Sequence, residues 1–155
     1  MPDSAPIAAD KGTSALQGWR EQRVVHYALR ESSRLTRPSI GGASVALIDL
    51  ATIRRHSVPA ALLAELESAA SHSPIAATWV EGAPVSFCYA GTMTESLWDV
   101  TVDTLEAQRG RGRAMSCVTF MIHHMRATGR EPVWAALETN RASRRLAEKL
   151  GFDPV

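Results

Sequence analysis

The stretch Gln108-Arg109-Gly110-Arg111-Gly112-Arg113-Ala114 decides how this sequence folds. A strand-like run, Leu97–Leu105, precedes it, and a run with helical spacing, Met115–Arg126, follows it. A strand, a tight glycine loop and a helix N-terminus together hold phosphate, because backbone N–H groups converge there and the helix dipole favours negative charge. The glycines let the main chain approach a phosphate where side chains would block it. The stretch therefore predicts a phosphate-binding loop.

Three short strands are predicted ahead of this loop. They cover Ile75–Val80, Val85–Ala90 and Leu97–Leu105. Turn residues separate them, first at Glu81-Gly82-Ala83-Pro84 and then at Gly91-Thr92-Met93-Thr94. Strands joined by short turns pair antiparallel, so the pattern predicts an antiparallel meander that ends at the loop.

A helix, a strand and a second helix are predicted after the loop. The first helix has an apolar stripe at Met115, Val118, Met121, Ile122 and Met125. Gly129 is placed to end it, and Pro132–Leu137 has the composition of a strand. Asn140 is a favoured N-cap for the last helix, which directs Leu146, Ala147 and Leu150 inward.

The first half of the chain is predicted to be rich in helix. Residues 1–13 have the small, polar composition of a flexible tail. The apolar spacing over 14–35 is closer to a helix than to a strand. Proline and glycine break the pattern over Arg37–Gly42, and Ala43–Leu50 is a short apolar run typical of a strand.

A further helix is expected before the meander, with Ser57 as its cap, Pro59 in its first turn and Ala70 near its end. The whole order predicts an α+β (mixed α/β) fold around one central, mostly antiparallel sheet flanked by helices. The length of 155 residues suits one domain over 14–155. Its first part, 14–74, would be helix-rich, and 75–155 would form the core that holds the phosphate-binding loop.

Composition and charge exclude several classes of protein. Apolar residues make up 45% and charged residues 21%, which is ordinary for a globular chain. The net charge of +1 gives no bulk electrostatic reason for nucleic-acid or membrane binding. No apolar run approaches the roughly 18 residues of a membrane span, and the N-terminus lacks the pattern of a signal peptide. Cys88 and Cys117 stand at no metal-ligand spacing, so we expect a reduced, cytoplasmic chain without a metal.

Two motifs lie in a fixed order along the second half of the chain. The first is the loop Arg109-Gly110-Arg111-Gly112-Arg113-Ala114, and the second is Asn140-Arg141-Ala142-Ser143 followed by Leu146–Phe152. Together they resemble the Arg/Gln-x-x-Gly-x-Gly/Ala loop and the closing Asn, helix and Leu-Gly-Phe pattern of the GNAT superfamily of N-acetyltransferases. More loosely, Ser86–Val100 looks like a subgroup of uncharacterised bacterial acetyltransferase-like proteins. The resemblance covers residues 75–155 and implies a GNAT-like fold.

The resemblance implies that the chain binds acetyl-CoA as a co-substrate and acts on a small-molecule or peptide amine. The amides of Arg109, Gly110, Arg111, Gly112, Arg113 and Ala114 would take the pyrophosphate. The pantetheine arm would hydrogen-bond to the main chain around Val102, Asp103 and Thr104. Asn140 corresponds to a family residue that contacts CoA near its thiol, and a polar contact to the cofactor is expected at Ser143.

The usual catalytic residues of the family are replaced in this sequence. The tyrosine that many members carry seven residues after the asparagine corresponds to Ala147, and a frequent glutamate corresponds to Ala135. Candidate bases remain at Glu95, Asp99, Asp103 and Glu138, and Asp99 and Glu138 are preferred. Asp99 lies within one residue of where some members keep a strand glutamate, and Glu138 follows the next strand. A proton relay through water stays open, so catalysis is expected to rest mainly on positioning.

The family usually continues with one or two strands after Leu-Gly-Phe, whereas this sequence stops at Val155. The resemblance therefore predicts a GNAT-like fold with a shortened C-terminal end. The missing wall of the acceptor site would come from the first half of the chain, for example Ala43–Leu50, from a partner subunit, or from nowhere. An exposed edge strand invites pairing, which favours a homodimer.

Three functions stay open on the sequence. The first is transfer of an acetyl group to an amine by direct attack in a ternary complex, without a covalent enzyme intermediate. The second is a GNAT-fold protein that binds CoA without catalysis, as a sensor or a partner-binding subunit. The third is a nucleic-acid binder that uses the loop arginines, and the small net charge and the lack of nearby aromatic residues argue against it.

Overall fold

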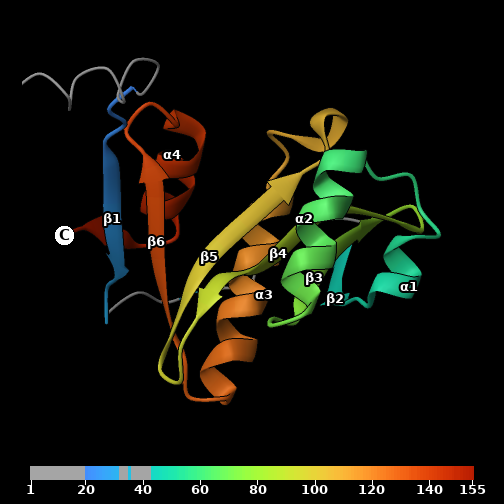
Figure 1. The fold of residues 1–155 in the computed structure, drawn as a ribbon, viewed down its shortest axis with the longest axis horizontal. Coiled ribbons are helices and arrows are strands. Elements are labelled where there is room, and N and C mark those ends of the chain that lie inside the picture. Colours follow the sequence, from blue (N-terminus) through green and yellow to red (C-terminus); the bar gives the residue numbers. More distant parts are fainter. Residues whose placement is uncertain (1–19, 32–34, 36–42) are drawn as a thin grey trace, which may run out of the picture.

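Seven strands of this chain form one continuous sheet in a computed structural model, which describes residues 20–31, 35 and 43–155. The elements are β1 (Val24–Leu29), β2 (Ala43–Leu47), α1 (Leu50–Ile53), α2 (Ala60–Ala70), β3 (Ile75–Val80), β4 (Ala83–Met93), β5 (Leu97–Thr104), the 3-10 turn η1 (Glu106–Gln108), α3 (Arg113–Ala127), β6 (Glu131–Leu137), α4 (Arg141–Lys149) and β7 (Phe152–Pro154). The strand order is β2-β3-β4-β5-β6-β1-β7 (Figure 1). Only β5 and β6 pair in parallel within the described sheet, so the predicted mixed fold with a mostly antiparallel sheet is confirmed.

The predicted meander of β3, β4 and β5 is confirmed, with antiparallel pairing throughout. The predicted turn at Gly91–Thr94 is wrong, because β4 runs on to Met93 and the chain reverses only after it. A β-bulge explains the error. Ala90 pairs with Val100 and Met93 pairs with Trp98, so two residues of β4, Gly91 and Thr92, lie opposite one residue of β5.

The elements after the loop lie where the sequence predicts them. Gly129, with a φ of +82°, follows the end of α3. The side chain of Asn140 caps α4, because its Oδ1 accepts a hydrogen bond from the Ser143 amide at 3.1 Å. These local signals predicted the boundaries because each is a hydrogen bond or a backbone conformation that its own residue type favours.

The predicted helix over 14–35 is wrong within the described residues, where Val24–Leu29 forms β1. Tyr27 is only 1% exposed, whereas its neighbours His26 and Ala28 are exposed, so burial alternates as in a strand. Antiparallel pairing with β6 on one side and β7 on the other decides this conformation. Paired main chain overrides the weak helical spacing of the apolar residues. The predicted tail over 1–13 and the predicted break at Arg37–Gly42 lie outside the described residues.

The segment between β2 and β3 holds two helices rather than one. The predicted strand over Ala43–Leu50 ends at Leu47, because α1 begins at Leu50 with Asp49 as its cap. Ser57 does not cap α2, whose N-cap is Pro59 without a side-chain hydrogen bond. The short helix α1 gave no periodic signal because four residues are scarcely more than one helical turn.

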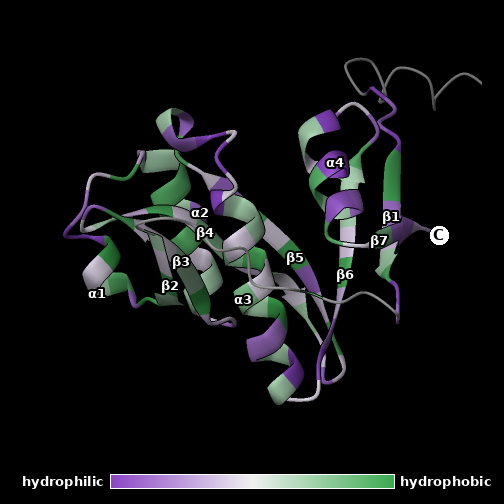
Figure 2. Ribbon diagram, turned by 180° about the vertical axis from the view of Figure 1, so that it is seen from behind, coloured by the Kyte–Doolittle hydropathy of each residue, from purple (hydrophilic) through white to green (hydrophobic). Residues whose placement is uncertain are grey.

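Two hydrophobic cores lie on opposite faces of the sheet. One packs α3 and α4 against residues of β4, β5, β6 and β1, and its largest members are Trp98, Trp134, Tyr27, Phe152, Met121, Ile122 and Met125. The other packs α1 and α2 against β3 and β4, around Ile53, Leu66, Ile75, Phe87 and Tyr89. Figure 2 shows α4 with strongly hydrophilic bands on the outside of this arrangement. Helices thus cover both faces of the sheet, and the loop before α3 lies at the face that α3 and α4 cover.

The sheet continues past β6 through β1 and the short strand β7. The missing wall of the acceptor site was predicted to come from the first half of the chain, from a partner subunit or from nowhere, and this stays a prediction. The first half of the chain contributes β1 beside β6, while Ala43–Leu47 forms β2 at the opposite edge. The Arg30 guanidinium and the Asp153 carboxylate, 3.0 Å apart, join β1 to β7. The predicted homodimer stays a prediction.

Candidate functional site

The glycine loop leaves β5 through the turn η1 and returns as the helix α3. The Nε of Arg109 donates to the carbonyl of Thr104 at 3.1 Å, which ties the loop back to the strand. Gly110 and Gly112 have φ values of +74° and +75°, in the left-handed region that other residues avoid. A Cβ built on either glycine would meet no atom within 4 Å. The loop therefore presents bare main chain to open space.

The N-terminus of α3 has no side-chain cap. Gly112 is its N-cap residue and makes no side-chain hydrogen bond. The first N–H groups of a helix have no acceptor within the helix, and they carry the positive end of its dipole. The buried hydroxyl of Thr78 on β3 donates to the carbonyl of Arg113 at 3.0 Å and fixes the first turn on the sheet. The result is a rigidly held group of donors suited to an anion.

The strands β5 and β6 separate beside this loop. They pair only over Leu97–Asp99 of β5, so the rest of that edge, Val100–Thr104, has no strand partner among the described residues (Figure 1). Main-chain groups alternate between the two sides of a strand. The Leu105 amide donates to the Val85 carbonyl of β4 at 2.9 Å. Because of this alternation, the amides of Val102 and Thr104 face the other side of β5 and point into the gap.

The helix α4 forms the far wall of this gap. The Nε1 of Trp134 on β6 donates to the hydroxyl of Ser143 at 3.0 Å. Arg144 donates from Nε to the Tyr27 hydroxyl at 3.0 Å and from Nη1 to the Glu138 carbonyl at 3.1 Å. These contacts lock the first turns of α4 to β6 and β1, and they hold Asn140 and Ser143 beside the gap.

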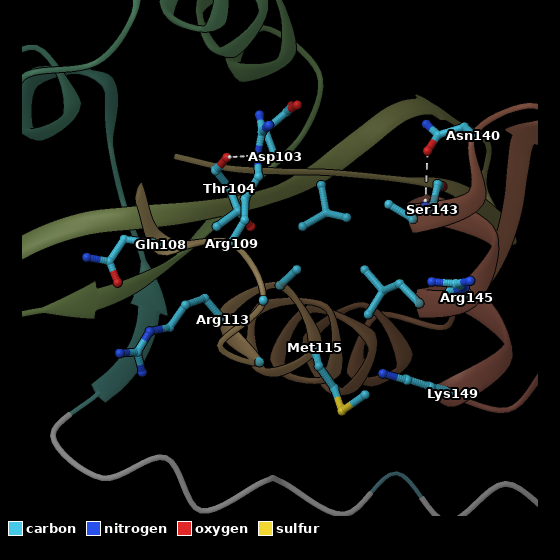
Figure 3. A pocket seen from close by; sticks show the side chains of 16 residues that line it. Asp103, Thr104, Gln108, Arg109, Arg113, Met115, Asn140, Ser143, Arg145 and Lys149 are labelled. Atoms are coloured by element: carbon cyan, nitrogen blue, oxygen red, sulfur yellow. Dashed lines mark hydrogen bonds between the residues drawn. The ribbon is translucent and has the colours of Figure 1, made fainter. Parts of the chain in front are cut away.

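One cavity of about 690 Å³ joins the loop, the open edge of β5 and α4 (Figure 3). It is lined by every residue predicted to bind the cofactor except Arg111, which is exposed: Val102, Asp103, Thr104, Arg109, Gly110, Gly112, Arg113, Ala114, Asn140 and Ser143. The role of these residues in binding stays a prediction. The structure adds Gln108, Met115, Ala142, Arg145, Leu146 and Lys149 to the lining. Four of these lie on α4, and only Leu146, three residues after Ser143, follows by helical spacing from a predicted residue.

The lining of the cavity suits an anionic ligand. Its lining includes four cationic side chains, of Arg109, Arg113, Arg145 and Lys149, against the single carboxylate of Asp103. Two buried polar atoms of lining residues, Oε1 of Gln108 and Nε of Arg113, have no hydrogen-bond partner in the described structure. Buried polar groups are normally paired, so an acceptor and a donor are left here for a ligand.

The two candidate bases lie in different surroundings. Asp99 is the last residue of β5 that pairs with β6, at the point where the strands diverge. Its Oδ1 is buried without a hydrogen-bond partner, and burial raises the pKa of its carboxyl above the usual 3.8, against a smaller opposing effect of His26. Its Oδ2 lies over Gly91, where an added Cβ would be 3.3 Å away. Glu138 is exposed, and neither carboxylate lines the cavity.

A second polar cluster lies on the α2 side of the sheet. The Tyr89 hydroxyl is 3.1 Å from Oδ2 of Asp103 and 3.2 Å from Oε2 of Glu65 on α2. Burial raises the pKa of Asp103, although the hydrogen bond from Tyr89 lowers it. The pKa of Tyr89 is raised by burial and by the two carboxylates, so its hydroxyl stays protonated and holds Asp103 in place. No local pattern in the sequence predicts this cluster, because its residues lie on three different elements, α2, β4 and β5.

Alanines occupy the two positions where the resemblance expects catalytic side chains, and the two differ in their exposure. Ala147 is completely buried on the core side of α4. Ala135 is exposed on β6 and pairs with His26 of β1. Neither side chain can transfer a proton, because alanine carries no titratable group.

The sequence pattern of the GNAT acetyltransferase family matches residues 77–155, and the chain belongs to that family. The predicted resemblance and the predicted GNAT-like fold are thus confirmed.

Solved structures share this fold at low sequence identity. A GCN5-related N-acetyltransferase-like protein from Streptococcus suis matches with a TM-score of 0.69 and 21% identity, over 92% of this chain and 63% of that one. An acetyltransferase of the GNAT family from Colwellia psychrerythraea gives 0.64 and 15%, over 87% and 53%. A putative acetyltransferase from Salmonella typhimurium, solved with its cofactor acetyl-CoA, gives 0.58 and 19%, over 73% and 80%. This chain thus spans less than two thirds of the first two proteins, and no curated protein matches it.

No helix in the described part of the chain has both the length and the apolar character to cross a membrane. The described residues hold no group of three or more His, Cys, Asp or Glu side chains placed to bind a metal ion. Cys88 and Cys117 are buried free thiols.

Proposed function

We propose that this chain is an acetyl-CoA-dependent N-acetyltransferase that transfers the acetyl group to a small-molecule or peptide amine by direct attack in a ternary complex. One observation carries the proposal: the glycine loop and the open edge of β5 line the same cavity. A glycine loop alone suits any phosphate. An adjoining strand edge with free N–H and C=O groups adds a site for a linear arm that contains amides. The Salmonella relative solved with acetyl-CoA supports this choice of cofactor.

The proposal assigns a separate part of the cofactor to each wall of the cavity. Acetyl-CoA supplies an acetyl group activated as a thioester. The amides of Gly110, Gly112 and the first turn of α3 hold the pyrophosphate. The gap-side main chain around Val102 holds the pantetheine arm, and an N–H of this edge polarises the thioester carbonyl. The Asn140 amide nitrogen is available to donate, because capping of α4 uses only its Oδ1.

We assign the general base to Asp99. It lies where β5 and β6 diverge, it has a free buried oxygen, and its raised pKa brings it nearer to the pH at which a base operates. It would accept the proton that the attacking amine loses, directly or through one water. Because Ala147 offers no acid, the leaving thiolate would take its proton from solvent. Glu138 is exposed and lies beyond the end of β6.

Binding and turnover test these statements separately. Calorimetry with acetyl-CoA should show one site on the chain, and no heat at millimolar cofactor would refute the proposal. Thiol release across a panel of primary amines should then detect turnover. Asp99→Asn should lower kcat and remove the acidic limb of the pH profile, whereas Glu138→Gln, the matched control, should behave as wild type. Full turnover by Asp99→Asn across pH would end the assignment of the base.

A second candidate function is a GNAT-fold protein that binds acyl-CoA without catalysis, as a sensor or partner-binding subunit. The buried Ala147 favours it, because that position offers no proton donor. Tight acetyl-CoA binding with no thiol release on any amine, and with hydrolysis no faster than in buffer, would support this function over the first.

A further inference from the structure

The cationic side chains of the cavity stand on two separate walls. Arg109 and Arg113 belong to the loop and the start of α3, whereas Arg145 and Lys149 belong to α4. Figure 3 shows Arg145 and Lys149 projecting from α4 on the side of the cavity away from Gln108 and Arg113. The cavity therefore has room for two anionic groups that do not share their cationic partners.

The two α4 cations form no ion pair within the described part of the chain. The ion pairs of the described residues are Arg30–Asp153, Arg54–Glu67 and Arg126–Glu131, and none involves Arg145 or Lys149. Their neighbour Arg144 differs, because its guanidinium is engaged with the Tyr27 hydroxyl and the Glu138 carbonyl. The Arg144 side chain thus stabilises the packing of α4, whereas the side chains of Arg145 and Lys149 are available to bind a ligand.

The spacing of the pair points to an anion. Residues four apart lie one above the other on a helix, so Arg145 and Lys149 repel each other when no anion lies between them. An arginine fork and an ammonium one turn apart match the oxygens of a phosphate monoester, which carries close to two negative charges. The pyrophosphate does not need them, because the loop amides and the start of α3 already provide its site.

We propose that Arg145 and Lys149 form a second phosphate subsite, which binds the 3′-phosphate of the CoA nucleotide and selects CoA thioesters over donors that lack it. The inference rests on the proposed function, because it takes the cofactor from there. CoA carries a phosphate monoester on its ribose in addition to the pyrophosphate. The loop binds the pyrophosphate, so the monoester needs cationic partners elsewhere in the cavity. A donor with only a phosphopantetheine arm, such as an acyl carrier domain, has no group for this subsite.

The test compares CoA with 3′-dephospho-CoA by calorimetry on the full chain. The wild type should bind CoA at least about tenfold more tightly than dephospho-CoA, since each charge-assisted contact is worth that much. The double variant Arg145→Gln, Lys149→Gln should bind CoA as weakly as dephospho-CoA, with the affinity for dephospho-CoA unchanged. Arg141→Gln is the matched control, because Arg141 is an exposed cation of the same helix that does not line the cavity. It should keep the preference of the wild type.

The outcomes separate this subsite from the proposed function. Equal weakening of CoA and dephospho-CoA in the double variant would overturn the subsite, because the pair would then serve the shared pyrophosphate. Equal affinity of the wild type for the two ligands would overturn it while leaving the proposed function intact. Failure of the wild type to bind either ligand would overturn both. Circular dichroism of the double variant should match that of the wild type, because both side chains are exposed.

Discussion

Substitution of Gly112 by alanine tests whether the bare main chain of the loop approaches a phosphate. Gly112 has a φ of +75°, caps α3 and lines the cavity. Alanine in this left-handed conformation costs about 1–2 kcal/mol of folding free energy. The added Cβ would touch nothing in the protein, so any larger effect has to come from the ligand.

Gly129 provides a matched control at the other end of α3. Its φ is +82°, an added Cβ would again meet nothing within 4 Å, and it does not line the cavity. Alanine at Gly129 should therefore cost about the same 1–2 kcal/mol of stability and leave binding alone. At Gly112 the methyl group would displace a phosphate from the loop amides. Loss of one hydrogen bond to a charged group is worth about 1.5–3 kcal/mol, or roughly 10- to 150-fold in Kd.

Urea unfolding measures the first effect and calorimetry with acetyl-CoA the second. We expect equal losses of stability in the two variants and a weakened Kd in Gly112→Ala alone. Wild-type affinity in Gly112→Ala, alongside its loss of stability, would refute a close approach of phosphate to this residue. Equal weakening in both variants would show that affinity follows the stability of α3 instead.

Three further predictions concern residues around the cavity. Because burial raises the pKa of Asp99, its charged form destabilises the fold at neutral pH. The stability that the Asp99 proton provides is complete below the usual pKa of 3.8 and is lost as the pH rises through the raised pKa. Asp99→Asn should therefore unfold at a higher urea concentration than wild type at about pH 7, and it should show no such advantage at about pH 3. Asn140→Ala should lose about 1 kcal/mol of stability with the cap, whereas Asn140→Asp should keep it, and both should weaken acetyl-CoA binding; unchanged urea midpoints for Asn140→Ala would contradict the cap. Cys88 and Cys117 are completely buried, and burial raises the pKa of both, that of Cys117 to about 12; a thiol reagent at mildly alkaline pH should label neither until the chain unfolds, and rapid labelling would contradict this burial.

The loop and the cap of α4 were predictable because each depends on residues that are neighbours in sequence. Glycine at positions of positive φ and asparagine at an N-cap express local backbone preferences that hold in any fold. The strand β1 was not predictable in this way. Its conformation depends on pairing with β6 and β7, which lie more than a hundred residues further along the chain.

The site was predictable only in part for the same reason. The residues of β5 and the loop follow from a motif, whereas Arg145 and Lys149 enter the cavity only once α4 is placed beside the gap. The contact of Tyr89 with Glu65 and Asp103 joins three elements and has no local signature. The turn predicted at Gly91 failed because a bulge, which depends on pairing with β5, kept the strand going.

The departures from ordinary packing gather in one region of the molecule. Among the described residues, four buried side-chain atoms lack a hydrogen-bond partner, in Trp98, Asp99, Gln108 and Arg113, and all lie between the start of β5 and the start of α3. The bulge of β4 lies opposite the same strand. A chain selected for stability alone would pair these atoms or replace them with apolar groups. Their persistence along one strand and its loop is expected where a ligand completes the hydrogen bonds. The cofactor should therefore stabilise this segment first, and amide hydrogen exchange with acetyl-CoA should slow most over β5, the loop and the first turn of α3.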